Sequence, residues 1–316
     1  MKAGLEACSC PLCGGNSYKP AMQVPDRFAS DGGMFQIVRC SHCEFFFLNP
    51  RPSPESMSAY YQNPDYQPFL STKESPPVWD RLYGVTRRFT IPAKRRQVEK
   101  YKKIGRVLDI GCGTGEFLVE MKQHGWQIAG LEKDARAAGY ASRQTGVSIT
   151  TSDLADAGYE PASFDLVTMW HVLEHLYTPA QTLRQIAALL KADGVLAVAM
   201  PNIGSQDAAY YKSEWVPLDA PRHLLHFTPA AMRRLCEQSG LQVVHHQQMV
   251  IDALYNCLMS EKFIASRRAS SLPAFLVAIV RALAVASASV LNASAMTGRA
   301  ERQGSSVLYF IIKQSG

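Results

Sequence analysis

The stretch R-V-L-D-I-G-C-G-T-G-E, from Arg106 to Glu116, decides the fold of this 316-residue chain. After Arg106, Val107 and Leu108 form a short apolar run, which is typical of a strand buried on both faces of a sheet. Glycine then recurs at every second position after Asp109, and apolar residues at helical spacing follow as far as Gly125. A strand, a glycine turn and a helix predict the nucleotide-binding half of a doubly wound α/β sheet, where the ligand lies against the backbone of the turn.

The spacing of these glycines distinguishes between classes of nucleotide. A dinucleotide fingerprint requires glycine where Glu116 stands, and this turn lacks the G-K-[ST] of a P-loop. The pattern V-L-D-x-G-x-G-x-G instead resembles motif I of class I S-adenosylmethionine (SAM)-dependent methyltransferases. Glu132 lies 23 residues after Asp109, at the end of the next predicted strand (residues 126–131), where an acid can hold both ribose hydroxyls.

The resemblance implies a SAM site at the carboxyl ends of the first strands. In the family, an acid after the third strand reaches the adenine amino group, and Asp153 stands at that position. Trp170 directly follows the fourth predicted strand. The cofactor-binding residues implied by the resemblance are Asp109, Gly111, Cys112, Gly113, Gly115, Glu132, Lys133, Asp153, Leu154 and Trp170.

Strands and helices alternate after motif I. Helices are expected to begin at Asp134, at Thr178–Pro179 and at Thr228–Pro229, where capping residues precede the first turn. In addition to the first two strands, the predicted strands are residues 147–151, 164–169, 195–200, 241–248 and 306–313. This order predicts an α/β fold with the Rossmann-like, seven-stranded sheet of class I methyltransferases, in which the last strand is an antiparallel insertion.

Two C-x-x-C knuckles, Cys10 to Cys13 and Cys40 to Cys43, are separated by 26 residues near the N-terminus. Four thiolates at this spacing fit a tetrahedral zinc site, and residues 1–52 resemble a zinc ribbon. All four coordination positions would be occupied by protein, so we interpret the zinc as structural. Cys8 is a competing ligand. The aromatic run at residues 45–48 is expected to dock the ribbon onto its neighbour.

Residues 53–104 are predicted to form a helical linker or cap. Either it lies over the cofactor and contributes Tyr60, Tyr61 and Tyr66, as in the family, or these tyrosines pack the ribbon against the core. Residues 81–103 carry nine Lys or Arg and one Glu, a local charge of +8 in a chain of net charge +6. This run is either a solvated helix face or a surface for anionic lipid or a phosphorylated substrate. It is not the distribution of a globally basic nucleic-acid binder.

A further segment, residues 251–304, interrupts the predicted methyltransferase core of residues 105–250 and 305–316. Within it, residues 272–293 contain one charge, Arg281, and are long enough to span a bilayer. We reject a single span, because it would place the last strand on the opposite side from the sheet that it must join. A helical lid, a dimer face, an in-plane membrane helix and a helix packed on the core remain open.

The composition is that of a soluble globular protein, with 47% hydrophobic and 19% charged residues. The first ten residues lack the apolar stretch of a secretory signal, and paired C-x-x-C cysteines indicate metal in a reducing compartment. We therefore expect a cytoplasmic protein, with attachment to the inner membrane surface and a homodimer left open.

Three histidines compete for the role of general base. His171 follows the fourth strand, closest to the expected methyl position, and His175 lies in V-L-E-H-L, which resembles the equivalent segment of ubiquinone-type O-methyltransferases. His223 lies in a loop that resembles the P-R-H-L-x-x-F-T signature of bacterial methyltransferases with a zinc ribbon. We favour His223 as the substrate-facing residue. Arg222 beside it either binds an anionic group of the substrate or forms a structural ion pair.

These features predict SAM-dependent methyl transfer to a small-molecule or glycan acceptor, with a hydroxyl oxygen as the preferred acceptor atom. No D/N-P-P-Y/F motif follows the fourth strand, which disfavours methylation of the amino groups of bases or glutamine. One alternative is an RNA methyltransferase, although residues 1–52, with five basic and four acidic side chains, are a poor grip for phosphates. The other alternative is a non-catalytic SAM-binding scaffold on a membrane surface.

Overall fold

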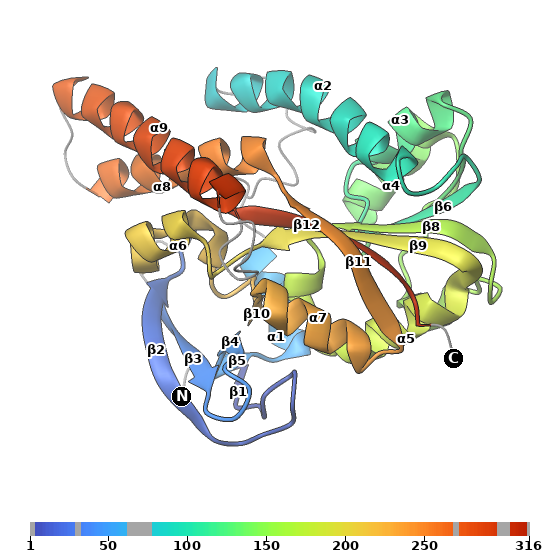
Figure 1. Cartoon of the computed structure of the whole chain (residues 1–316), viewed down its shortest axis with the longest axis horizontal. Helices are drawn as coiled ribbons and strands as arrows, with labels where there is room; N and C mark the ends of the chain where they lie inside the picture. Colours follow the sequence, from blue (N-terminus) through green and yellow to red (C-terminus); the bar gives the residue numbers. More distant parts are fainter. Residues whose placement is uncertain (1–3, 29–32, 62–77, 268–271, 296–303, 315–316) are drawn as a thin grey trace.

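The computed structural model describes residues 4–28, 33–61, 78–267, 272–295 and 304–314 (Figure 1). Tyr66, one of the three tyrosines considered for the cofactor side, lies outside these residues. The remainder of the predicted linker is helical where it is described, as α1 (Pro54–Met57), the 3-10 turn η1 (Ser58–Tyr61) and α2 (Val78–Glu99).

A mixed six-stranded sheet forms the core of the molecule. Its strand order is β11 (Leu241–Gln248), β12 (Ser306–Lys313), β9 (Leu190–Pro201), β8 (Phe164–Trp170), β6 (Arg106–Ile110) and β7 (Gln127–Leu131). The last four strands in this order run parallel, whereas β12 pairs antiparallel with both β9 and β11. The predicted antiparallel insertion of the last strand is therefore confirmed.

The seventh predicted strand is missing from the described part of the chain, which corrects the seven-stranded expectation. Residues 147–151 contribute only a single parallel bridge, between Leu131 and Thr150. The amide of Ile149 instead donates to the Ser142 hydroxyl at 3.1 Å, and that of Val147 donates to the Thr145 hydroxyl. These side chains of the preceding helix occupy amides that could otherwise pair in a ladder, so the strand does not extend.

Helices cover both faces of the sheet. Figure 1 shows α2, α3 (Glu116–Gln123) and α4 (Ala135–Thr145) on one side and α5 (Pro179–Leu189) and α7 (Pro229–Glu237) on the other. Two of the predicted helix starts are capped as expected. The Asp134 side chain accepts from two amides of α4, and the Thr228 hydroxyl accepts from an amide of α7. The first turn of α5 has Pro179 but lacks a side-chain cap from Thr178.

The N-terminal segment is not separate from the rest of the molecule. Its strands β2 (Tyr18–Pro25), β3 (Met34–Cys40) and β4 (Phe46–Leu48) form a sheet whose fourth strand is β10 (Leu225–His226), from the far part of the chain. Phe45 also packs edge-on against Phe227, with ring centroids 5.1 Å apart. A second short pair, β1 (Leu5–Glu6) and β5 (Arg51–Pro52), closes the segment. The aromatic run thus docks the knuckles onto the loop that carries His223.

The excursion before β12 consists of two helices, α8 (Val250–Arg267) and α9 (Leu272–Ala295), which pack against each other. Among the residues that the structure describes, no helix is long and apolar enough to cross a membrane. The helix pair extends toward the left of Figure 1, with α9 on its outer side. The shorter elements α6 (Gln206–Tyr211), η5 (Lys212–Glu214) and η6 (Val216–Leu218) lie between β9 and β10 in the chain.

Candidate active site

The glycine turn after β6 leaves an open side at one position. Gly111 and Gly113 both have positive φ, at 69° and 55°, which favours glycine. A Cβ at Gly111 would lie 2.5 Å from Val172, so this position needs glycine for packing as well. A Cβ at Gly113 would meet nothing within 4 Å. The turn is therefore packed against Val172 at Gly111 and is accessible to a ligand at Gly113.

Two of the three predicted carboxylates lie beside this turn. Asp109 is buried at the end of β6, where the Thr168 hydroxyl donates to its Oδ1 at 2.6 Å and burial raises its pKa to about 7. Glu132 accepts from the amide of Gly113 at Oε2 and from that of Asp134 at Oε1, both at 2.9 Å. The Glu132 side chain thus holds the glycine turn in place, and its remaining lone pairs can accept from a ligand.

The other predicted cofactor residues lie on the segments that follow β6 and β7, at the end of β8 and at the start of the 3-10 turn η3 (Leu154–Asp156). Asp153 is exposed and pairs with Lys133, which joins the ends of two neighbouring segments. Leu154 begins η3, next to Asp153. Trp170, at the end of β8, packs edge-on against Phe117, and the Lys94 ammonium of α2 lies 4.5 Å from its ring centroid. Gly115 precedes α3, and Cys112 is buried within the turn. The fold brings all ten predicted residues to one edge of the sheet.

The three candidate histidines surround one buried carboxylate, that of Glu174. The 3-10 turn η4 (Leu173–His175) carries Glu174 and His175. The loop with His223 is held against this turn, because the amide of Leu224 donates to the Glu174 carbonyl at 2.9 Å. Neither carboxylate oxygen of Glu174 accepts a hydrogen bond in the described part of the chain. The sequence reasoning missed Glu174, although its position next to His175 in V-L-E-H-L was a usable signal.

His171 is held between two carboxylates. Its Nε2 lies 3.2 Å from Asp252 Oδ2, and its Nδ1 lies 3.6 Å from Glu174 Oε1. Burial opposes a charge on His171, but the nearby carboxylates of Asp252 and Glu174 outweigh this effect and raise the pKa of His171 to about 9. His171 is therefore protonated near neutral pH and is a poor acceptor of a further proton.

His175, in contrast to His171, is neutral because the effect of burial dominates. Burial, together with the neighbouring His223, lowers its pKa to about 4. Its Nδ1 lies 3.0 Å from the carbonyl oxygen of Arg222 and 2.9 Å from the Tyr61 hydroxyl. Since a carbonyl only accepts, Nδ1 carries the proton. His175 is a weak base, and Tyr61 packs on it from the N-terminal side of the chain.

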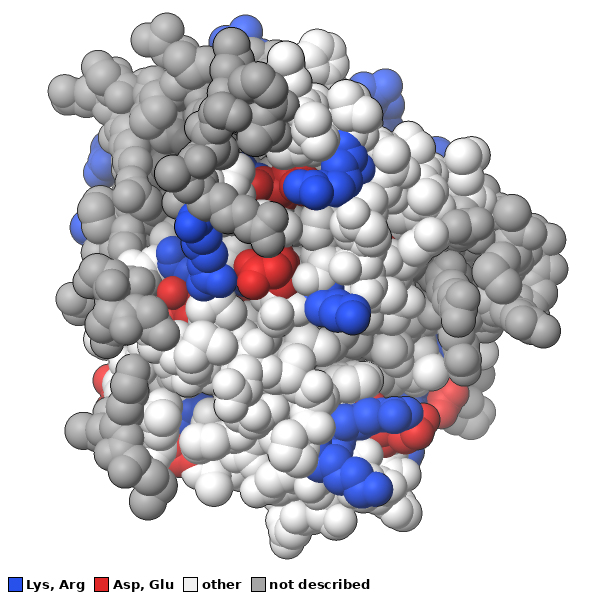
Figure 2. All heavy atoms as spheres, turned by 90° about the vertical axis from the view of Figure 1, so that its left-hand side faces the viewer, with Lys and Arg blue, Asp and Glu red and all other residues white. Residues whose placement is uncertain are grey.

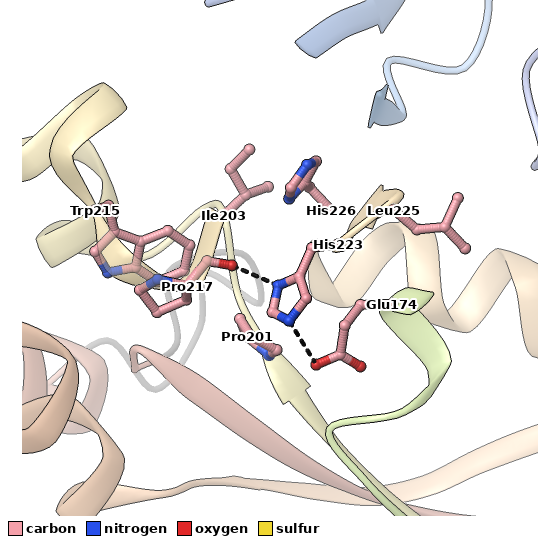
Figure 3. Close-up of a pocket in the computed structure, with 8 residues that line it drawn as sticks. All are labelled: Glu174, Pro201, Ile203, Trp215, Pro217, His223, Leu225 and His226. Carbon is pink, nitrogen blue, oxygen red and sulfur yellow. Dashed lines mark hydrogen bonds and ion pairs between the residues drawn. The ribbon is translucent and has the colours of Figure 1, made fainter. Parts of the chain in front are cut away.

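His223 has one ring nitrogen fixed and one directed toward Glu174. Its Nδ1 lies 2.7 Å from the Pro217 carbonyl oxygen and therefore donates to it, while Nε2 lies 3.9 Å from Glu174 Oε1 (Figure 3). Burial would raise the pKa of Glu174, but the protonated His171 beside it lowers the pKa to about 2. His223 lines a small pocket with Glu174, Pro201, Ile203, Trp215, Pro217, Leu225 and His226.

Arg222 forms a structural ion pair. Its guanidinium is fully buried and donates to Asp219 at 2.8 Å and to Asp26 at 3.0 Å. It also donates to the carbonyl of Tyr60 and stacks on Phe28. Of the two interpretations of Arg222, the structure supports the ion pair, which ties the N-terminal segment to the loop of His223. Tyr60 likewise packs its ring on Phe35 of the N-terminal sheet.

Two groups of side chains could hold a metal ion. The sulfur atoms of Cys10, Cys13, Cys40 and Cys43 all lie within 4.8 Å of one another, and the closest pairs are 3.4 and 3.6 Å apart. Cys8 is outside this group, and its amide donates to the side chain of Asn49. The second group is Glu174, His175 and His223, whose ligand atoms also lie within 4.8 Å of one another.

The basic run of α2 is partly neutralised where it is described. Arg95 pairs with Glu99 and with Glu120, and Lys102 pairs with Asp193 at 2.6 Å. The first pair lies within α2, the pair with Glu120 joins α2 to α3, and Lys102 joins the segment after α2 to β9. They match the interpretation of this run as a helix surface better than that of a continuous anion-binding surface.

The chain is similar in sequence to known methyltransferases. Residues 85–246 match the family described as "Methyltransferase domain". The chain is 30% identical over 165 residues to a ubiquinone biosynthesis O-methyltransferase of Neisseria meningitidis serogroup A, covering 47% of this chain and 68% of the relative. It is 27% identical to the protein of the same name from Idiomarina loihiensis, covering 50% and 70%.

Among solved structures, one similar chain is a SAM-dependent methyltransferase from Thermotoga maritima, described as a possible histamine N-methyltransferase. It is 17% identical, with a TM-score of 0.49, and the similarity covers 79% of this chain and 98% of that one.

Proposed function

Since the chain belongs to the class I SAM-dependent methyltransferases, we propose that it methylates a hydroxyl oxygen of a small-molecule or glycan acceptor. The observation that carries this proposal is the pairing of His223 with the buried carboxylate of Glu174. Methylation of a hydroxyl requires a group that takes its proton, whereas methylation of an amine or an ionised oxygen does not. The relatives named as O-methyltransferases support the same acceptor atom.

His223 is the best of the three candidate bases. His171 already carries a proton near neutral pH, and the pKa of His175, about 4, makes it a weak base. The Nε2 of His223 carries a lone pair, because the proton of the neutral ring is held at Nδ1 by Pro217. In the reaction, the acceptor hydroxyl would donate to Nε2 while its oxygen attacks the methyl group. Nε2 would keep the proton, and the ionised Glu174 would stabilise the resulting imidazolium.

SAM supplies the methyl group and a positively charged sulfur that leaves as a neutral thioether. We propose that it binds along the turn of Asp109, Gly111, Cys112, Gly113 and Gly115. Glu132 would accept from the ribose hydroxyls and Asp153 from the adenine amino group, with Lys133, Leu154 and Trp170 around them. The open side at Gly113 and the free lone pairs of Glu132 support this assignment.

We also propose one structural zinc ion on Cys10, Cys13, Cys40 and Cys43. Sulfur atoms around a tetrahedral zinc ion lie about 3.8 Å apart, given Zn–S distances of about 2.3 Å. The closest sulfur pairs, at 3.4 and 3.6 Å, are near this spacing. When bound, the ion would hold the two knuckles together, and through β10 it would support the loop of His223.

Transfer of a labelled methyl group from SAM into fractionated extract of the source cell tests the proposed function. We expect label in a small-molecule or glycan fraction, bound through an ether that resists mild base. Label that nuclease treatment releases would instead show an RNA methyltransferase. SAM binding without label in any fraction, together with intact folding, would favour the non-catalytic scaffold.

A further inference from the structure

The helix α9 has its small residues inside and its large apolar residues outside. Its buried positions are Ala278, Ala282, Ala286 and Ser289. Its outward positions are Leu276, Val277, Val280, Leu283 and Leu291, with exposed fractions of 58%, 60%, 66%, 47% and 66%. A surface helix of a soluble domain normally shows the reverse arrangement. The outer face of α9 is therefore an apolar stripe made by residues at helical spacing.

Specific contacts fix the orientation of this helix. Arg281 of α9 forms a bidentate ion pair with Glu261 of α8, and the Ser289 hydroxyl donates to the carboxylate of Asp207 of α6 at 2.9 Å. The small inner residues also let α9 approach α8 closely. Turning the apolar stripe inward would break these buried polar contacts, so the exposure of the stripe is built into the packing of the helix pair.

Further exposed apolar residues lie at the start of α8. Val250, Ile251 and Leu254 are exposed there, and Asp252 between them reaches His171 at 3.2 Å. The helix pair is thus attached directly to the candidate active site. Figure 2 views the end of the molecule toward which the pair extends in Figure 1, and shows a largely uncharged surface with small, separated groups of charged side chains.

The charges of the helix pair are complementary to an anionic surface. The sequence of α9 contains no acidic residue. Both acids of α8 point inward, since Asp252 pairs with His171 and Glu261 pairs with Arg281. Lys262 and Arg267 of α8 are exposed, although Arg267 also lies 3.4 Å from Glu214. Exposed apolar and basic side chains without exposed acids are typical of a helix that lies in the plane of an anionic membrane.

We propose that the α8–α9 pair docks on an anionic lipid bilayer, with the outer face of α9 lying in the interface. A second copy of the chain fits this surface less well, because a two-fold contact would bring two surfaces with the same basic residues, Lys262 and Arg267, together without exposed acids of the helix pair to balance them. The pair lies outside the matched methyltransferase residues, 85–246, so the inference rests on this chain's own structure. It does not depend on the acceptor or on the proposed base.

Flotation of the full-length protein with vesicles tests the proposal. We expect it to float with phosphatidylcholine vesicles that contain phosphatidylglycerol, to float less at high salt, and to remain behind with phosphatidylcholine alone. The double variant Val280→Glu/Leu291→Glu places two charges in the stripe and should lower the bound fraction about tenfold. The matched control Met34→Glu/Val244→Glu adds the same charge at apolar positions of similar exposure elsewhere and should bind like the original chain.

Thermal melting and SAM titration of both double variants show whether each is folded. Unchanged flotation of a folded Val280→Glu/Leu291→Glu variant overturns the proposal, as does equal loss in the control pair. Absence of flotation by the original chain also overturns it. If sedimentation then shows a dimer that only the α9 variant disrupts, the stripe is an interface between two copies. Methyl transfer by vesicle-free protein is a separate readout, so failure here leaves the proposed enzyme activity untouched.

Discussion

The proposed cofactor side of the candidate site is made by residues that are close in sequence, whereas the proposed acceptor side is assembled from segments far apart. Motif I and Glu132 lie on two consecutive strands and are joined by the bond from Gly113 to Glu132. The acceptor side brings together Glu174, His223 and Asp252, with Tyr61 from the N-terminal region. A common cofactor can be bound by a local motif, but the acceptor side is specific to this fold as a whole.

The two sides also use their carboxylates differently. Each carboxylate oxygen of Glu132 accepts a hydrogen bond from a backbone amide, so Glu132 stabilises the glycine turn. Neither carboxylate oxygen of Glu174 accepts a hydrogen bond in the described part of the chain, and the charge of Glu174 is balanced by the protonated His171 beside it. A buried carboxylate of this kind sets the protonation of its neighbours. Changes on one side should therefore affect SAM binding, and changes on the other side should affect turnover.

The largest effect is expected from loss of the four-cysteine site, which should harm the acceptor side and spare the cofactor side. Structural zinc sites contribute about 10–16 kcal/mol of binding free energy to their folds. The sheet of the knuckles includes β10, next to His223, so Cys40→Ser should abolish metal binding and turnover while SAM still binds. Metal analysis should give one zinc ion per original chain. Substitution of Cys8 by Ser is the control and should retain the metal; if it does not, the assignment of the knuckles is wrong.

The second prediction concerns the base. His223→Ala should lower turnover about 10²–10⁴-fold, as expected for loss of a general base, with little change in SAM affinity. Single-turnover kinetics and calorimetric titration measure the two effects separately. His171→Ala is the comparison, and because His171 is already protonated it should not remove the base. If His171→Ala abolishes turnover and His223→Ala does not, the base lies after β8. Loss of SAM binding in His223→Ala would show that the two sides are not independent.

The third prediction tests the cofactor side. Glu132→Ala should weaken SAM binding by about 1.5–3 kcal/mol for each hydrogen bond lost to the ribose. Glu132→Gln retains the size of the side chain and separates the loss of charge from the loss of packing against the glycine turn. Calorimetric titration with SAM alone measures the affinity of both variants. An unchanged SAM affinity in Glu132→Ala would remove Glu132 from the cofactor site.

The smallest effect is a pH dependence of stability on the acceptor side. The pKa of His175 falls from 6.5 to about 4 on folding, so the unfolded chain binds more protons in between. The free energy of unfolding is therefore highest above the unfolded pKa of His175, 6.5. It decreases as the pH falls toward 4, because protonation of His175 favours the unfolded chain. Linkage gives a loss of about 2 kcal/mol between about pH 7 and pH 5. Urea unfolding at both pH values measures it, and His175→Asn should lose less; an equal loss would assign the effect to other groups.

The strands and the glycine turn of the proposed cofactor side were predictable because their signals are local. A strand, a glycine turn and a helix leave their pattern in consecutive residues, and the bounds of β11 and β12 also follow from their patterns. The strand predicted at residues 147–151 is wrong because side chains there compete with the neighbouring strand for backbone amides. Ser142 and Thr145 on α4 take the amides of residues 147 and 149, so the seventh strand shrinks to one bridge. Apolar alternation alone does not reveal such a competition.

By itself, the sequence determined the nucleotide-binding half of the sheet, the grouping of the four knuckle cysteines and the set of candidate histidines. Short-range geometry dictates each of these, because a few bonds separate the residues involved or their spacing is that of a known site. Only the tertiary structure decided that Glu174 joins the histidines, that Arg222 is enclosed by Asp26 and Asp219, and that α9 turns its leucines outward. These outcomes depend on which distant segments share a buried space, and burial sets both the charge of a histidine and the exposed face of a helix.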